Sequence, residues 1–107
     1  MKTVWKYSIP YTRQTYGVFD IPENAFWLHT DLDPKSGEIS LWYEVEPDEP
    51  RKRVNVLLVG TGQLIPEEFT RPRGTVVIAK YGLVLHLFEA DAKEEKYRIV
   101  APEPELF

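Results

Sequence analysis

The sequence contains no cysteine, and this absence excludes disulfide bonds, thiolate metal sites and a cysteine nucleophile. Long apolar runs are missing as well, since no stretch approaches the roughly 20 residues that a membrane-spanning helix needs. The N-terminal stretch MKTVWKYSIPYTRQ contains Lys2, Lys6 and Arg13 and no continuous apolar segment. We therefore expect no signal peptide and no membrane association, and a reducing cytoplasm suits the chain.

Helical periodicity is also absent, and short runs of β-branched and aromatic residues recur between turn-forming residues. The predicted strands are Thr3–Ile9, Thr15–Ile21, Phe26–Leu32, Gly37–Val45, Lys52–Val59, Thr75–Lys80, Leu83–Phe88 and, more weakly, Lys96–Val100. A length of 107 residues indicates one domain. We predict an all-β fold, a single compact antiparallel β-sandwich or small barrel of about seven to eight short strands. This domain spans residues 1–100, and a Pro- and Glu-rich tail follows at 101–107.

The clearest predicted hairpin joins Phe26–Leu32 to Gly37–Val45 through the loop DPKS. In the register that a four-residue loop implies, Leu28 lies opposite Leu41 on the core face. The outward face then carries Trp27, His29 and Asp31 opposite Trp42, Ser40 and Glu38. Two tryptophans on a nominally polar face are unusual. We expect a second sheet, the tail, a partner subunit or a ligand to cover them.

The segment Leu83–Phe88 is apolar on both faces. Such a strand belongs in the middle of a sheet with a layer on each side. Because a chain of this length has little material with which to cover both faces, we predict a homo-oligomer.

Positive charge is scarce overall but concentrated in the middle of the chain. The net charge of −4 and the pI of 5.2 argue against binding to duplex nucleic acid. Residues 51–80, however, contain 6 basic and 2 acidic residues. This segment suits a compact anionic ligand.

The run of apolar residues after Arg53 ends in Gly60-Thr61-Gly62, which raises the question of a phosphate-binding loop. A dinucleotide fingerprint needs a third glycine where Ile65 stands and a helix directly afterwards, but Pro66 interrupts. The sequence also lacks the Gly-Lys-Ser/Thr that a Walker A loop requires. Either the glycines allow a bulge or a positive φ at the strand exit, or their N–H groups form a small anion-binding nest.

Several arginines come close to this motif in the sequence. Arg71 and Arg73 flank Pro72 in a predicted stiff loop, where guanidinium groups suit bidentate binding of phosphate or carboxylate. The alternative is that they are solubilising charges at strand ends. Aromatic residues beside arginines can stack a base or line a protein interface. The predicted ligand-binding residues are Arg13, Gln14, Trp42, Arg53, Gly60, Thr61, Gly62, Arg71 and Arg73.

The sequence predicts no catalytic residues, no metal and no cofactor. In the predicted register His29 lies opposite Ser40 with Asp31 nearby, but flat strand positions lack the strained turn and oxyanion hole of a triad. His86 is expected to be a hydrogen-bonded core histidine. Two histidines without ligand spacing do not indicate a metal site.

Several short motifs resemble a family of small proteins from tailed bacteriophages and prophages that is catalogued as a domain of unknown function. They are WKY at Trp5–Tyr7, Arg13-Gln14, Pro22, SLWYEV around Trp42, VGTGQLIP at Val59–Pro66, GTV at Gly74–Val76 and LHLFE at Leu85–Glu89. The resemblance covers residues 5–89 and leaves the residues after Glu89 outside. It implies a viral accessory or structural protein in the cytoplasm of an infected bacterium or in the virion, and it brings no activity.

Three functions follow as hypotheses. The first is a non-catalytic binder that sequesters an anionic ligand such as a signalling nucleotide, in the manner of a counter-defence protein. The second is a protein-interaction or virion-associated module that binds a host or virion protein through a Trp27/Trp42 face. The third is an enzyme, for which no nucleophile, base or metal set supplies support.

Overall fold

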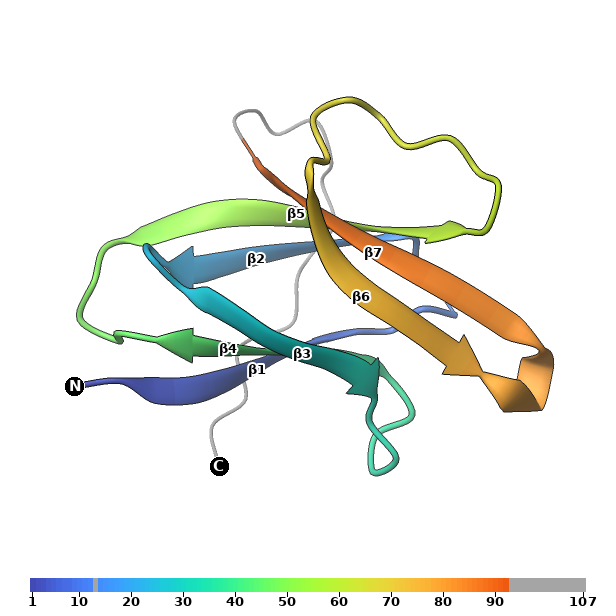
Figure 1. The fold of residues 1–107 in the computed structure, drawn as a ribbon. Coiled ribbons are helices and arrows are strands. Elements are labelled where there is room, and N and C mark those ends of the chain that lie inside the picture. Colours follow the sequence, from blue (N-terminus) through green and yellow to red (C-terminus); the bar gives the residue numbers. More distant parts are fainter. Residues whose placement is uncertain (13, 93–107) are drawn as a thin grey trace.

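The computed structural model describes residues 1–12 and 14–92, which form two antiparallel β-sheets (Figure 1). The strands are β1 (Thr3–Ile9), β2 (Tyr16–Pro22), β3 (Phe26–Leu32), β4 (Ile39–Val45), β5 (Arg51–Gly60), β6 (Arg71–Ile78) and β7 (Leu83–Asp91). Sheet A has the order β1-β4-β3, and sheet B has the order β2-β5-β7-β6. The predicted all-β fold is thereby confirmed. The predicted strand Lys96–Val100 and the tail lie outside the described residues.

The core lies between the inner faces of the two sheets. Alternate residues of each strand point inward, so Leu41, Tyr43 and Val45 of β4 meet Val54 and Val56 of β5 in one buried cluster. Aromatic contacts cross the interior at its centre. The ring of Tyr7 lies 4.9 Å from that of Phe19 and 5.9 Å from that of Tyr43, measured between centroids. The alternation of inward and outward residues, with a period of two, explains why these segments form strands and not helices.

A second, smaller cluster covers the outer face of sheet B. Leu57 and Phe88, directly opposite each other on β5 and β7, pack in it with Phe69 from the loop that joins β5 to β6. The Phe69 ring lies 6.5 Å from that of Tyr16. The apolar outer face of β7 is therefore partly covered by the chain's own loop, which the sequence argument for a homo-oligomer had not included.

The predicted register of the β3–β4 hairpin was wrong. Leu32 pairs with Ile39, and a β-bulge between Trp27 and His29 changes which residues face the core. Trp27 is packed against the core, whereas Phe26 and Leu28 are 65% and 43% exposed. The proposed Trp27/Trp42 face does not exist, because the bulge places the two side chains on opposite sides of sheet A.

The start of β6 also differs from the prediction. The segment Arg71-Pro72-Arg73 belongs to the strand and not to a loop before Thr75. Because β6 is the last strand of sheet B, it tolerates a proline that cannot donate a backbone hydrogen bond. A bulge follows, where Gly74 has a φ of +91°. An added Cβ at Gly74 would lie 3.3 Å from the Trp27 ring, so glycine also allows close packing between β6 and β3.

The edges of the two sheets meet at the corners of the sandwich. Strand β3 lies beside β6, and β1 lies beside β2. A short 3₁₀ helix, η1 (Ala79–Tyr81), joins β6 to β7 and ends at Gly82 in the left-handed conformation. Within the described ranges no helix has the length and hydropathy to cross a membrane.

Substitution of Gly17 tests the packing between β1 and β2. A Cβ added at Gly17 would lie 2.8 Å from the Cδ1 and Cγ1 atoms of buried Ile9 and 3.0 Å from Phe19. We expect Gly17→Ala to lower the free energy of unfolding by about 1–3 kcal/mol through overpacking. Gly60→Ala is the matched control, because its new Cβ would come no nearer than 3.6 Å, to the Gln63 side chain. Urea unfolding that gives equal stabilities for the two variants would contradict this account of the β1–β2 corner.

Candidate functional site

The main polar site is a cluster inside the sandwich, formed by Glu89, Tyr43, Arg71 and Arg73, which we call the Glu89 cluster. Glu89 has the same orientation on β7 as Leu85 and Leu87, so its side chain points between the sheets. Its carboxylate is 5% exposed. Arg71 and Arg73 reach it from the neighbouring strand β6, and Tyr43 reaches it from β4 of the opposite sheet.

Five hydrogen bonds converge on the two carboxylate oxygens of Glu89. The Tyr43 hydroxyl donates to Oε1 over 2.5 Å. Arg71 donates from Nε and Nη2 to Oε2, at 3.1 and 2.8 Å. Arg73 donates from Nε to Oε1 at 3.1 Å and from Nη2 to Oε2 at 3.5 Å. Such saturation is what a buried carboxylate requires, because an unpaired charge there would cost several kcal/mol, of order 3–5.

The electrostatics of the cluster keep Glu89 ionised and Tyr43 protonated. Burial raises the pKa of Glu89, but the hydrogen bonds from Tyr43 and the two arginines outweigh burial, so its pKa lies below the ordinary value of 4.5. Burial, and then the nearby charge of Glu89, raises the pKa of Tyr43 well above its ordinary value. Tyr43 therefore acts as a hydrogen-bond donor to the ionised Glu89.

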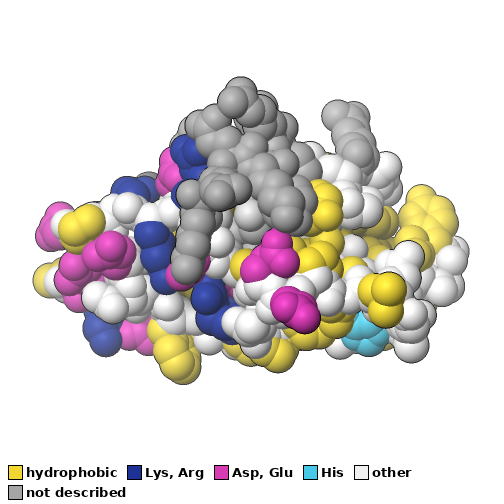
Figure 2. Space-filling view, turned by 90° about the horizontal axis from the view of Figure 1, so that it is seen from above, with side chains coloured by type: hydrophobic (Ala, Val, Ile, Leu, Met, Phe, Trp, Pro, Cys, Tyr) yellow, Lys and Arg dark blue, Asp and Glu magenta, His cyan; other side chains and the backbone are white. Residues whose placement is uncertain are grey.

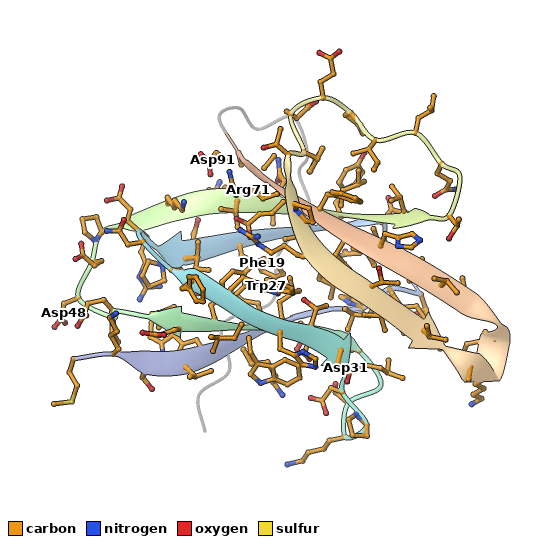
Figure 3. All side chains as sticks on the ribbon, in the orientation of Figure 1. Phe19, Trp27, Asp31, Asp48, Arg71 and Asp91 are labelled. Carbon is orange, nitrogen blue, oxygen red and sulfur yellow. The ribbon has the colours of Figure 1, made fainter. Side chains whose placement is uncertain are left out.

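Both arginines also contact groups other than the Glu89 carboxylate. Arg71 donates to Asp91 at 2.8 Å, and Figure 3 shows these two side chains next to each other. Arg73 donates to the carbonyl of Pro72, and its guanidinium carbon lies 5.6 Å from the centre of the Trp27 ring. Trp27 in turn donates its indole N–H to the Thr30 hydroxyl at 2.8 Å. The cluster thus connects β4, β6 and β7 with the corner strand β3.

The structure brings together Arg71 and Arg73, but it keeps them apart from Gly60. Gly60 lies opposite Leu85 and Arg71 lies opposite Glu89, so four residues of β7, about 13 Å of strand, separate the two positions. Arg53 points to the opposite face of sheet B from neighbouring Val54 and donates to Asp20 at 3.0 Å. The three described arginines of the predicted set therefore do not converge on the glycine turn.

The turn at Gly60–Gly62 forms a small polar group of its own. Gly62 has a φ of +91°, and the Gly60 N–H donates to the Gln63 side chain at 2.7 Å. The Thr61 hydroxyl lies 2.7 Å from Nε2 of His86, and the Thr75 hydroxyl lies 2.9 Å from its Nδ1. His86 is hydrogen-bonded as predicted, but it lies on the outer face of sheet B and not in the core.

The remaining predicted residues lie elsewhere. Trp42 is on the outer face of sheet A, where it stacks on His29 with the ring centroids 6.0 Å apart. His29 is opposite Trp42, and Asp31 is opposite Ser40, so the predicted pairing of His29 with Ser40 was wrong. Gln14 is half-buried, and its amide nitrogen has no hydrogen-bond partner among the described residues. Arg13 lies outside the described residues.

Sequence reasoning missed Glu89, Tyr43 and Asp91. One signal was available for Glu89, because it continues the alternation of inward residues that begins at Leu85 and Leu87. An acidic residue at a core-facing position requires cationic partners. Over residues 1–12 and 14–92, no group of three or more His, Cys, Asp or Glu side chains is arranged to hold a metal ion.

The fold and the Glu89 cluster define a two-sheet β-sandwich domain with an internal network of ion pairs. The chain belongs to the family described as Domain of unknown function (DUF7352), whose model matches residues 1–98. The match continues beyond Glu89, where the sequence resemblance was expected to end. No curated protein and no solved structure matches the chain.

Replacement of Glu89 tests whether the cluster stabilises the fold. Glu89→Gln leaves two half-buried guanidinium groups without their carboxylate, so the free energy of unfolding should fall by about 2–4 kcal/mol at neutral pH. The matched control is Glu44→Gln on β4, which removes an exposed pair with Lys2 and should change stability very little. Chemical denaturation of the three proteins gives the comparison.

The lowered pKa of Glu89 also predicts that the stability lost in Glu89→Gln depends on pH. Because the pKa of Glu89 is lower in the folded state, its stabilisation is present above the unfolded value near 4.5 and is lost as the pH falls through the folded value. The stability difference between wild type and Glu89→Gln should therefore be constant near neutral pH and shrink in acid. A difference that persists unchanged to pH 3 would show that the charge on Glu89 is not what the arginines stabilise.

Proposed function

We propose that this domain is a non-catalytic protein-interaction module. The observation that carries the proposal is a group of exposed apolar side chains at the β6–β7 end of the molecule, which we call the hairpin surface. Four of the ten large exposed hydrophobic residues are on the hairpin, namely Val77, Tyr81, Leu83 and Val84, and Leu64 and Ile65 are on the loop before β6. Val77 and Val84 share the outer face of sheet B, whereas Leu83, opposite buried Ile78, is on the other face. Exposed apolar side chains grouped at one end of a soluble domain are a feature of protein contact sites.

The β6–β7 part of the hairpin surface is also nearly free of charge. Lys80 is the only charged residue between Thr75 and Phe88, in a chain of which 28% is charged. Figure 2 looks down on the outer face of sheet B, and Lys, Arg, Asp and Glu side chains gather toward the end away from the hairpin. Depletion of charge and an exposed aromatic residue such as Tyr81 are both features of protein interfaces.

The anion-capture hypothesis receives less support from the geometry. A phosphate at Arg71 and Arg73 would compete with the carboxylate of Glu89, which already accepts five hydrogen bonds, and with Asp91. The ionisable groups of the cluster satisfy one another, so we propose binding through apolar contact and not catalysis. The setting, an infected bacterium or a virion, is part of the proposal and depends only on the sequence resemblance to phage proteins.

Site-specific photo-crosslinking tests the proposed function. A photoreactive amino acid would replace Val77 on the hairpin surface, or Phe26 on sheet A as a control with nearly the same exposure, 64% against 65%. In cells that naturally contain the protein, we expect irradiation to produce a discrete crosslinked protein from position 77. Mass spectrometry of the adduct identifies what was bound. Absence of any adduct from position 77, or equal adducts from both positions, would contradict the proposal.

A further inference from the structure

We infer that the partner that binds the hairpin surface is a second copy of this chain, so that two hairpin surfaces pack face to face about a twofold axis. The inference rests on the proposed function, because it names the partner for the same surface. It would give the protein a self-assembly role.

Charge is the first reason to choose a second copy. A twofold interface places a surface against itself, so every charge near its centre lies close to an identical charge. Most of this molecule is unsuited to such contact, because the chain has 13 basic and 17 acidic residues. The β6–β7 part of the hairpin surface is an exception, because Lys80, beside Tyr81 in the turn between the strands, is its one charged residue, whereas Glu67 and Glu68 follow Ile65 on the loop. Two copies therefore meet there without repulsion at the centre.

Shape is the second reason. Val77 and Val84 are directly opposite each other on β6 and β7, and their side chains lie on the outer face of sheet B because Val76 and Ile78 point inward. In Figure 1 the hairpin extends beyond the other strands, and Val77 and Val84 are 64% and 38% exposed. Two sheets can stack at about 10 Å with such side chains interdigitating. Tyr81 at the turn and Leu64 on the neighbouring loop would enlarge the contact.

The available area predicts a weak dimer. Leu83 faces away from Val77 and Val84, so few large side chains are available, and a dimer would bury roughly 1,000 Å² or less in total, at the lower limit for a specific interface. We therefore expect a dimer that forms in the micromolar range and dissociates on dilution.

The other exposed apolar group fits a second copy less well. Val4, Phe26 and Leu28 lie on sheet A, where Glu44 is the cross-strand neighbour of both Val4 and Phe26. Self-association there would bury two Glu44–Lys2 ion pairs, whose desolvation is costly. The hairpin surface has no acidic residue in an equivalent position on β6 or β7 between Thr75 and Phe88.

Sedimentation equilibrium of the purified full chain tests the inference, over about 5–500 μM. We expect the weight-average mass to rise from monomer towards dimer with concentration. Val77→Asp should weaken association at least tenfold, whereas Phe26→Asp, at a site of nearly equal exposure, should leave it unchanged. Because Val77 is 64% exposed, the variant should fold, and Leu64→Ser, at a loop residue 94% exposed, is an independent second variant. A monomeric wild type at all concentrations overturns the inference, as does equal weakening by Val77→Asp and Phe26→Asp.

The failures of the two proposals are distinguishable. A chain that is monomeric throughout but forms an adduct with a different protein from position 77 would overturn the twofold dimer and leave the interaction module standing. A monomeric chain without any adduct from position 77 would overturn both. A crosslinked species of twice the chain mass, lost in Leu64→Ser but retained in Phe26→Asp, would support both.

Discussion

The carboxylate of Glu89 is the constraint on which the arrangement of the two sheets depends. A charge inside a small β-sandwich is tolerated only if nearly all of its hydrogen-bonding capacity is filled, because desolvation is otherwise too costly. Here the partners come from three strands: Tyr43 on β4 and the two arginines on β6 bind Glu89 on β7. The contact of Arg73 with Trp27 extends the constraint to β3. One carboxylate therefore sets how the corner between β3 and β6 closes.

This constraint divides the β6–β7 pair into two parts with different roles. At one end, Arg71, Arg73 and Glu89 neutralise one another and hold β6 against the sandwich. At the other end, Val77 and Val84 lie on an exposed and almost uncharged surface. Because the charged end is occupied by internal ion pairs, the proposed binding surface is at the apolar end. In the proposed interaction, the ion pairs at the base of the hairpin would reduce the entropy that the hairpin loses on binding.

The local errors of the sequence interpretation have identifiable causes. Pro72 indicated a loop, but on an edge strand a proline loses no hydrogen bond, so β6 begins four residues earlier than expected. The bulge beside Leu28 inserts one residue and thereby exchanges the faces on which Phe26 and Trp27 lie. No residue type in that hairpin indicates a bulge. The arginines looked available for a ligand because their partners, Glu89 and Asp91, lie 16 to 20 positions away in the sequence.

The sequence by itself determined the fold class and most of the strands, because alternation of apolar residues and the positions of glycine and proline act within a few neighbouring residues. It also determined that β7 would be apolar on both faces. Tertiary structure alone decided which strands pair, where the loop around Phe69 covers sheet B, and which cations meet which carboxylates. These features arise from contacts between distant segments, whose geometry depends on bulges and sheet order that no local pattern encodes.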